Sequence, residues 1–357
     1  MAHSTNFLHS PTRPFKAEPN LKADEILKRM EGISFQGRNL AKAYKIWKRM
    51  LADDVLIFLG VAGALSAGGL RLLIAQIVAN RWIDCVVSTG ANLYHDLHET
   101  RGRHHYIGDA SVDDSLLQKA HVDRVYDTYA SEDEFIDNDN WIANYATTLE
   151  SRPYTSREFL FKLGKHLWDE TGTEGILTSA YRANVPIFCP AIADSSIGMG
   201  LSQGRHLKSG VGHIDVIGDV IESTNLVIRR RQTASIVLGG GTPKNFINQA
   251  SVQAEFYCPE IKGHQYAMQI ITDVPHYGGA SGSSLSEAQS WGKLAADADY
   301  VTVHADATVA LPLLVSGLAS SARSTLEARR PPVFKLNQQA MIVDGIPLPV
   351  SGYDVNH

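Results

Sequence analysis

The stretch Val55-Leu56-Ile57-Phe58-Leu59 is apolar at every position and leads directly into glycines at positions 60, 63, 68 and 69. Apolar residues at helical spacing follow over residues 72–78. A strand without polar positions is typical of a parallel sheet covered on both faces, because neither side of it meets water. The apolar strand, the glycine turn and the helix together predict a βα unit.

The same pattern recurs along the chain. Five further apolar runs end in small or polar turns, at residues 83–87, 185–188, 234–238, 266–272 and 300–304. Helical stretches lie between them, and one begins at the capping box Thr155-Ser156-Arg157-Glu158. This alternation predicts an α/β fold with a doubly wound, mainly parallel sheet.

The turns that follow the strands suggest a ligand site. Open parallel sheets bind ligands beyond the carboxyl ends of their strands, where glycine turns and helix N-termini present N–H groups to phosphate. No turn is a complete G-x-G-x-x-G motif, so the prediction of a dinucleotide site rests on their accumulation.

Composition excludes several classes of protein. The 357 residues are 44% hydrophobic and 20% charged, as in ordinary globular proteins. A formal charge of −5 gives no reason to expect nucleic acid or an anionic membrane as a partner. We find no apolar run long enough to span a membrane and no signal-peptide pattern. Three widely spaced cysteines fit reduced thiols, so we expect a cytoplasmic protein.

The chain divides into three predicted parts. Residues 1–20 carry three prolines and predict a mobile arm. Residues 21–328 form the predicted catalytic domain, beginning with helices near 23–31 and 40–51. Residues 329–357 are read as a C-terminal tail, for which both a strand and a contact between subunits stay open.

The stretch Ser290-Trp291-Gly292-Lys293 contains the strongest candidate for chemistry. It follows the small-residue loop 278–284 and the acidic Glu287. A partly buried lysine has a lowered pKa, and its neutral amine attacks a carbonyl or imine carbon. The alternative is a solvated lysine on a helix face, with Trp291 in the core.

The sequence offers two other possible chemistries. A histidine-rich stretch could hold a metal ion, with His95 and His98 on one helix face, or could form a solvated polar turn; its members are His95, Asp96, His98, Glu99, His104 and His105. No second cluster of metal ligands matches it, so we expect no metal. A serine hydrolase is disfavoured, because the G-x-S-x-G motif is missing.

Taken together, these motifs resemble the deoxyhypusine synthase family over residues 22 to about 320. The most specific is Ser290-Trp291-Gly292-Lys293, which is similar to the catalytic lysine segment of that family. The other matching motifs are Phe58-Leu59-Gly60, Val87-Ser88-Thr89-Gly90, Asp96-Leu97, Pro190-Ala191 with Asp194 and Ser196, Leu238-Gly239-Gly240-Gly241 with Lys244, Glu287-Ala288, and Ala305-Asp306-Ala307 before Pro312-Leu313-Leu314.

The resemblance implies a Rossmann-like fold and a transferase that uses NAD without net oxidation. Spermidine is oxidised, its 4-aminobutyl group passes to Lys293 as an imine with loss of 1,3-diaminopropane, and an acceptor amine then receives the group. The implied NAD-binding residues are Thr89, Gly90, Asp194, Ser196, Gly239, Gly240, Gly241, Thr272, Asp273, Gly278, Ser281, Asp306 and Ala307. Members are tetramers with active sites at dimer interfaces, and an N-terminal arm can cover the entrance.

Departures from the family pattern concern the amine substrate. On the implied substrate side Trp291 and Glu287 are retained, whereas Asn245 replaces a general-base histidine and Met199 replaces a polyamine-binding aspartate. Further acidic positions are lost at Tyr94, His95, Tyr277 and Ala280. His95 or His276 could replace the base, and Asp273 could supply a carboxylate.

These departures predict a changed donor or acceptor. The leading hypothesis is transfer to a small amine such as putrescine, as in homospermidine synthases of this descent. The alternatives are a true deoxyhypusine synthase that modifies a lysine of the hypusine-bearing translation factor, an inactive NAD-binding paralogue, and hydrolysis of a guanidino amine such as agmatine.

Overall fold

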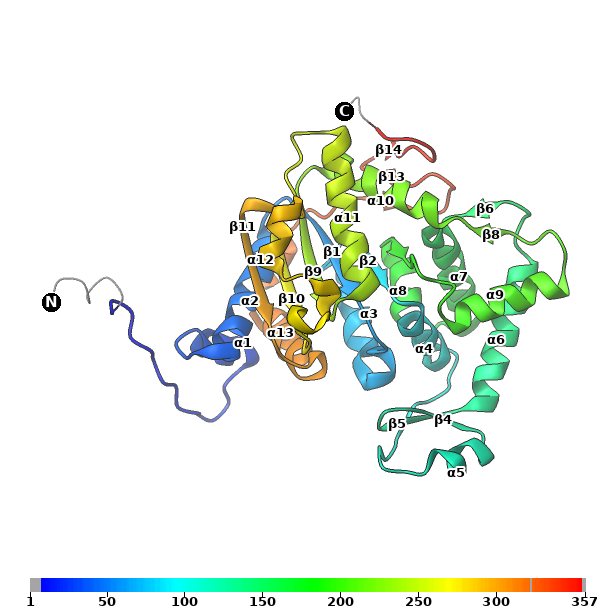
Figure 1. The fold of residues 1–357 in the computed structure, drawn as a ribbon, viewed down its shortest axis with the longest axis horizontal. Helices are drawn as coiled ribbons and strands as arrows, with labels where there is room; N and C mark the ends of the chain where they lie inside the picture. The colour runs from blue at the N-terminus through cyan, green and yellow to red at the C-terminus, as the bar shows by residue number, and fades with distance from the viewer. Residues whose placement is uncertain (1–7, 322, 355–357) are drawn as a thin grey trace.

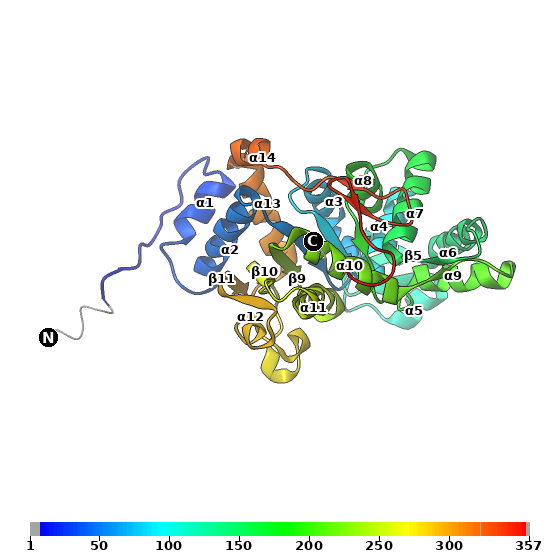
Figure 2. The same cartoon turned by 90° about the horizontal axis from the view of Figure 1, so that it is seen from above.

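A six-stranded parallel sheet forms the centre of the molecule. The computed structural model describes residues 8–321 and 323–354. The sheet has the strand order β11-β10-β9-β1-β2-β7, and helices cover both of its faces (Figures 1 and 2). Its strands are β1 (Leu56–Val61), β2 (Cys85–Ser88), β7 (Ile187–Phe188), β9 (Thr233–Leu238), β10 (His264–Ile270) and β11 (Leu294–Val303). The predicted doubly wound α/β fold is confirmed.

Helices make up most of the remaining structure. They are α1 (Ala23–Met30), α2 (Phe35–Ala52), α3 (Arg71–Ala79), α4 (Gly90–Thr100), α5 (Asp114–Lys119), α6 (Glu132–Thr147), α7 (Ser156–Thr171), α8 (Ile176–Ala183), α9 (Ser196–Leu207), α10 (Val216–Arg230), α11 (Gly241–Tyr257), α12 (Leu285–Ala288), α13 (Ala307–Ser321) and α14 (Arg323–Ala328). Within the described ranges, none of them is both long and apolar enough to cross a membrane.

Small sheets lie outside the centre. One consists of β3 (Tyr106–Ile107), β4 (Val122–Val125) and β5 (Thr128–Ser131), and a second pairs β6 (Pro153–Tyr154) with β8 (His213–Ile214). The third comprises β12 (Phe334–Lys335), β13 (Ile342–Val343) and β14 (Ile346–Pro347).

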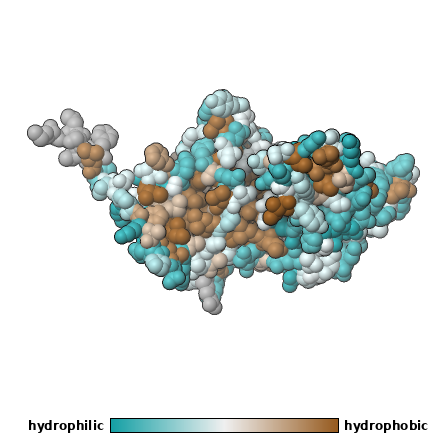
Figure 3. Space-filling model, turned by 90° about the horizontal axis from the view of Figure 1, so that it is seen from below, coloured by the Kyte–Doolittle hydropathy of each residue, from teal (hydrophilic) through white to brown (hydrophobic). Residues whose placement is uncertain are grey.

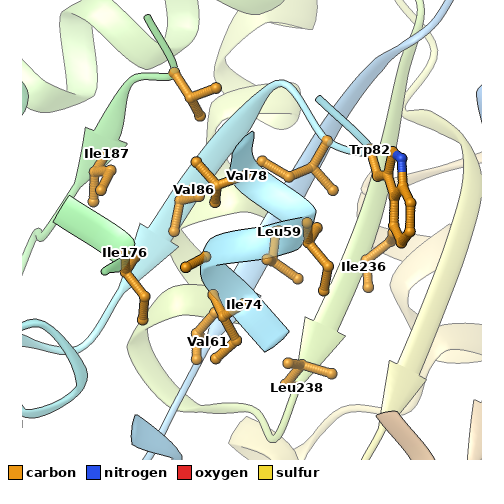
Figure 4. Packing of buried hydrophobic residues seen from close by; sticks show 14 of the residues in the cluster. Leu59, Val61, Ile74, Val78, Trp82, Val86, Ile176, Ile187, Ile236 and Leu238 are labelled. Atoms are coloured by element: carbon orange, nitrogen blue, oxygen red, sulfur yellow. The ribbon is translucent and has the colours of Figure 1, made fainter. Parts of the chain in front are cut away.

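Side chains alternate between two hydrophobic cores because successive strand residues point to opposite faces. The pairing register places Ile236, Leu59, Val86 and Ile187 in one row across four strands. Figure 4 shows this row packed against Ile74 and Val78 of α3 and Ile176 of α8. The opposite face, which includes Leu56 and Phe58, packs against α10 and α11. A strand apolar at every position is therefore buried on both sides.

The strand order reverses at the boundary between β1 and β9. After β1 the chain proceeds through β2 to β7, and it then returns to the other side for β9, β10 and β11. Helix α3 follows β1 on one face, whereas α11 follows β9 on the other. Helices that follow neighbouring strands toward opposite faces of the sheet open a crevice at the carboxyl ends of those strands.

The described part of the C-terminal segment packs against the core formed with α10 and α11. Phe334, Met341 and Val343 join the core formed with α10 and α11. The buried Arg157 of α7 pairs with Glu222 and donates to the carbonyl of Leu336 at 3.3 Å. Figure 2 shows the red C-terminal chain crossing α10. Strand structure is present in this segment, whereas a contact between subunits stays a prediction.

Two boundaries differ from the sequence prediction. Strand β11 begins at Leu294 instead of residue 300, because Leu294 pairs with His264 before an irregularity in the register. In the predicted arm, the described residues from 8 to 20 contain no helix or strand, and Arg13 donates its N–H to the Gly32 carbonyl at 2.7 Å. All three cysteines are buried and free of disulfides.

Candidate active site

The glycine turns after β1 and β9 meet where the strand order reverses. The N–H of Ala62 donates to the carbonyl of Leu238 at 3.0 Å. A Cβ at Gly239 would lie 3.0 Å from the Cβ of Ala62, and the φ of Gly239 is +82°. This close approach and this backbone conformation both favour glycine. The crevice expected of an open α/β sheet is thus lined here by backbone atoms of the two turns.

The turn after β2 is hydrogen-bonded to the glycine turn after β1, beside the same crevice. The Thr89 hydroxyl donates to the carbonyl of Gly63 at 2.7 Å, and the Asn92 amide donates to that oxygen at 2.9 Å. A Cβ at Gly90 would lie only 2.2 Å from the Ser195 hydroxyl oxygen. Glycine therefore lets the start of α4 approach the start of α9, which brings together the predicted residues Thr89, Gly90, Asp194 and Ser196.

The predicted residues after β9 and β10 share one loop region. The Gln269 amide donates to the carbonyl of Gly239 at 2.8 Å, and a Cβ at Gly240 would lie 3.3 Å from the Cα of Ala280. The Asp273 carboxylate packs against Gly279, where it leaves no room for a Cβ. It also accepts the N–H of Val274 at 2.8 Å. Along this loop, exposed positions include Thr272, Gly278 and Ser281.

Asp306 borders a cavity at the end of β11. It precedes Ala307, the first residue of α13, and its carboxylate accepts the N–H and the hydroxyl of Thr308, both at 2.7 Å. These bonds lower the pKa of Asp306 below its ordinary value. The cavity has a volume of about 600 Å³ and is also lined by Gly68, Gly69 and Glu99. An exposed carboxylate there can accept hydrogen bonds from hydroxyl groups.

Lys293 lies between the short turn η4 (Gln289–Trp291) and β11. Its N–H donates to the Ala288 carbonyl at 3.0 Å. Its Nζ lies 5.4 Å from the centre of the Trp291 ring, within the range of a cation–π contact. Trp291 is 68% exposed, so the alternative that placed it in the core is wrong.

Glu287 presents a fixed negative charge nearby. Its Oε2 accepts the N–H of Ser284 at 2.8 Å and the Ser284 hydroxyl at 2.7 Å, which completes the capping box of α12. These two bonds lower the pKa of Glu287, so its carboxylate is ionised at neutral pH.

Lys244 is a second lysine of this site. It is 2% exposed, and its Nζ donates to the carbonyls of Ala280 at 2.7 Å and Ser283 at 2.5 Å. Burial and the charge of Lys293 lower the pKa of Lys244 to about 8, while Glu287 opposes this shift. We refer to Lys244, Glu287, Trp291 and Lys293 as the lysine cluster.

The remaining predicted substrate residues are divided between two places. Asn245 is exposed beside Lys244 at the start of α11. Met199 is exposed on α9, whereas His95 is buried on α4. In the sheet, β10, β9 and β1 lie between β11, which follows Lys293, and β2, which precedes α4. Strands lie about 4.8 Å apart, so four steps across the sheet correspond to roughly 19 Å.

The histidine-rich stretch is not a solvated turn. His95 and His98 are buried, and Asp96 accepts the N–H groups of Ile176 and Leu177 at 2.8 and 3.0 Å. Asp96 therefore stabilises the start of α8. Among the residues that the structure describes, no group of three or more His, Cys, Asp or Glu side chains could hold a metal ion.

Comparison with known proteins identifies the family. The family model described as deoxyhypusine synthase matches residues 25–318. The chain belongs to the deoxyhypusine synthase family. It is 43% identical over 334 residues to "Probable deoxyhypusine synthase 2" of Methanosarcina mazei, covering 93% of this chain and 96% of that protein. It is also 40% identical over 305 residues to "Deoxyhypusine synthase-like protein" of Coxiella burnetii, covering 82% and 85%.

A solved structure supports the fold. The crystal structure of a "putative deoxyhypusine synthase" from Entamoeba histolytica matches with a TM-score of 0.58 and 18% identity. The match covers 87% of this chain and 97% of that chain. The predicted family and its α/β fold are confirmed, whereas the roles of individual residues stay predictions.

Sequence reasoning missed two features of the site. Lys244 was noted only as part of a motif, since a helical lysine is usually solvated. The sequence suggests His105 and Glu99 only as metal ligands, whereas in the structure the Nδ1 atom of His105 lies 2.6 Å from Oε1 of Glu99. The apolar residues near Lys244 in the sequence could have indicated its burial, and the spacing of the histidines could have indicated their contact.

Proposed function

We propose that this protein is an NAD-dependent transferase that moves a 4-aminobutyl group from spermidine or a related polyamine to an acceptor amine through Lys293. The observation that carries the proposal is the lysine cluster beside the glycine turn of β9, in a chain of the deoxyhypusine synthase family. A transferase needs an amine nucleophile, an anionic anchor and an apolar face for the substrate, and this cluster supplies all three.

The carboxyl edge of the sheet fits a dinucleotide. The N-termini of α4, α9, α11 and α13 follow strands at this edge, and helix N-termini favour phosphate. Thr89, Ser196 and the turn Gly239 to Gly241 would hold the pyrophosphate, while Asp306 would accept hydrogen bonds from a ribose. NAD held there would supply an acceptor for the hydride of the amine and a donor for the final reduction.

Lys293 would carry the aminobutyl group. Its neutral amine attacks the carbon of the oxidised C=N bond of the substrate, and 1,3-diaminopropane leaves as the new C=N bond to Nζ forms. An acceptor amine then displaces Lys293 in the same way. The charge of Lys293 lowers the pKa of the buried Lys244, so the two amines of the lysine cluster lie close enough to influence each other.

Two side chains would recognise the polyamine itself. The exposed ring of Trp291 offers an apolar and cation-binding face to an alkylammonium chain. The ionised carboxylate of Glu287 would pair with a terminal ammonium group. Both lie within the lysine cluster, so the chain could be held with its reactive carbon near Lys293.

A small amine such as putrescine is the acceptor that we favour. The replacements at Asn245 and Met199 change the substrate side of the site, while the glycine turns and Asp306 are retained. The second candidate is deoxyhypusine synthesis on a protein lysine, and the names of the Methanosarcina relatives favour it.

An active site shared between two chains would explain the separation of the lysine cluster from α4 and α9. The protein would then be a homo-oligomer, and a tetramer is expected from the resemblance. The underside of the molecule exposes apolar side chains over a broad central area (Figure 3). Exposed apolar residues include Leu72 on α3 and Val309 on α13. Such an area is typical of an interface.

The direct test uses the purified protein with NAD and spermidine, with and without putrescine, and mass spectrometry of the amines. Release of 1,3-diaminopropane together with homospermidine is expected. Release of 1,3-diaminopropane only when the translation factor is added would favour the second candidate. An absence of release under every condition would refute transfer from spermidine.

A further inference from the structure

The carboxylate of Asp273 occupies the space of a side chain that Gly279 lacks. A Cβ built on Gly279 would lie 2.0 Å from the Cγ of Asp273. A covalent Cβ–Cγ bond is about 1.5 Å long, so an aspartate at position 279 would place its carboxyl group close to that of Asp273. Gly279 has a φ of −69° and a ψ of 173°, an extended conformation that any residue adopts. The missing side chain therefore makes room for Asp273, and the backbone does not require glycine there.

A short loop connects Asp273 to the lysine cluster. Gly279 is followed by Ala280, whose carbonyl accepts a hydrogen bond from the Nζ of Lys244 at 2.7 Å. Ala280 also lies against the glycine turn of β9, because a Cβ at Gly240 would be 3.3 Å from the Ala280 Cα. Asp273 therefore lies where the proposed dinucleotide pocket meets the lysine cluster.

The side chain of Asp273 is accessible to a ligand. The residue is exposed, and its Oδ1 accepts the N–H of the adjacent Val274 at 2.8 Å. Within the described ranges, no lysine, arginine or histidine forms an ion pair with it. A carboxylate without a cationic partner attracts a cationic ligand and repels an anionic one.

This charge suits an amine better than the dinucleotide. The pyrophosphate of NAD is anionic, and Asp306 at the end of β11 already offers a carboxylate to a ribose. A polyamine carries positive charge at both ends, whereas the Glu287 carboxylate would pair with only one of them. A second anion near the lysine cluster is therefore needed, and the exposed Asp273 supplies it.

We propose that Asp273 is the second anionic anchor of the amine substrate, and that Asp273 and Glu287 together select diamines and polyamines over monoamines. The inference rests on the proposed function and deepens it, since it assigns Asp273 to the substrate instead of the cofactor. The N–H of Val274 and the backbone of Gly279 hold the carboxylate in place. A fixed carboxylate forms charge-assisted hydrogen bonds with an ammonium group at little cost in side-chain entropy.

The first experiment measures binding to the full-length protein by isothermal titration. NAD is titrated alone, and amines are titrated with NADH present, so that no amine is oxidised. Asp273→Asn should weaken spermidine and putrescine by about 10-fold or more, as expected for the loss of one charged hydrogen bond. Affinity for NAD should not change, and affinity for butylamine should fall by no more than about twofold because Glu287 remains. The exposed Asp297 on β11 gives the matched control Asp297→Asn, with no effect on any ligand.

The second experiment moves the carboxylate to position 279. Asp273→Ala should weaken diamine binding as Asp273→Asn does. Adding Gly279→Asp to Asp273→Ala should restore most of the affinity, because the new carboxyl group would occupy nearly the same place. Adding Gly279→Asn instead should restore nothing, since the side chain has the same shape without the charge.

The outcomes separate this inference from the proposed function. A wild type that binds diamines through Asp273 but transfers no aminobutyl group would refute the proposed function and leave the anchor in place. Equal losses of NAD and amine affinity in Asp273→Asn would return Asp273 to the cofactor pocket and overturn the inference. Unchanged amine affinity in Asp273→Asn, a wild type that binds no amine, or a folded Asp273→Ala/Gly279→Asp protein without recovery would also overturn it.

Discussion

The ammonium group of Lys244 donates a 2.7 Å hydrogen bond to the backbone carbonyl of Ala280. Ala280 and Ser281 have φ values of +51° and +59°, a region that residues other than glycine rarely adopt. Lys244 therefore holds a strained loop against the glycine turn of β9, since it also binds the carbonyl of Ser283. Strain of this kind persists only where neighbouring groups enforce it.

Replacing Lys244 by methionine should loosen this loop. The buried carbonyl of Ala280 and the partly buried carbonyl of Ser283 would lose their donor, which costs about 1–3 kcal/mol for a buried group left unpaired. We expect a lower melting temperature and an increase in KM for the amine of about 10-fold. Lys262→Met is the control, because the Lys262 side chain is exposed and forms an ion pair with Glu255. Equal effects of both variants on KM would contradict the loop-holding role.

Much of this architecture followed from the sequence. The cap at Thr155 was predicted, and its hydroxyl accepts the N–H of Glu158 at 3.2 Å. However, the Glu158 carboxylate accepts a hydrogen bond from Arg152 and not from the backbone N–H of Thr155, so the capping box is incomplete. The glycine turns were visible because they need particular backbone angles. The burial of Lys244 and the pairing of His95 with His105 were not, since both depend on how distant segments pack.

Replacing Trp291 by alanine should weaken amine binding more than NAD binding. A cation–π contact of 1 to 2 kcal/mol corresponds to a rise in KM of about 10-fold. Isothermal titration with each ligand separates the two affinities. Phe256→Ala removes another exposed aromatic side chain of the chain and should change neither. Equal losses of amine and NAD affinity for Trp291→Ala would show a structural role only.

Mixing two inactive variants should restore activity if sites are shared between chains. Lys293→Ala removes the nucleophile of the lysine cluster. Asp194→Ala changes the other half of the proposed site, at the start of α9. Each shared site would combine the lysine cluster of one chain with the α9 region of the other. In a mixed dimer, one site would therefore carry both substitutions and the other site neither. Random pairing should return roughly a quarter of the wild-type sites. The test refolds or co-expresses the two variants, and a mixture as inactive as its components would place each site within one chain.

Asp219 should make stability depend on pH. It is fully buried on α10, and its carboxylate accepts the N–H of Ser156 at 2.8 Å. Burial raises the pKa of Asp219 from 3.8 to about 7, and the hydrogen bond from Ser156 only partly opposes this. The folded state then binds the proton more tightly than the unfolded state, so this contribution to stability is complete below pH 4 and is lost as the pH rises to about 7.

Asp219→Asn should remove that part of the pH dependence. Urea denaturation at pH 5 and pH 8 measures the difference in the free energy of unfolding. We expect a smaller difference for the variant than for the wild type, and no change for the exposed Asp169→Asn. An unchanged difference in Asp219→Asn would mean that the carboxylate titrates as in the unfolded chain.

The covalent adduct on Lys293 tests the central claim most directly. The protein is incubated with NAD and spermidine, treated with borohydride to reduce any imine, digested, and analysed by mass spectrometry. The account predicts an aminobutyl group on the peptide that contains Lys293 and none in Lys293→Ala. A wild type that turns over spermidine without an adduct there, or with the adduct on Lys244, would contradict it.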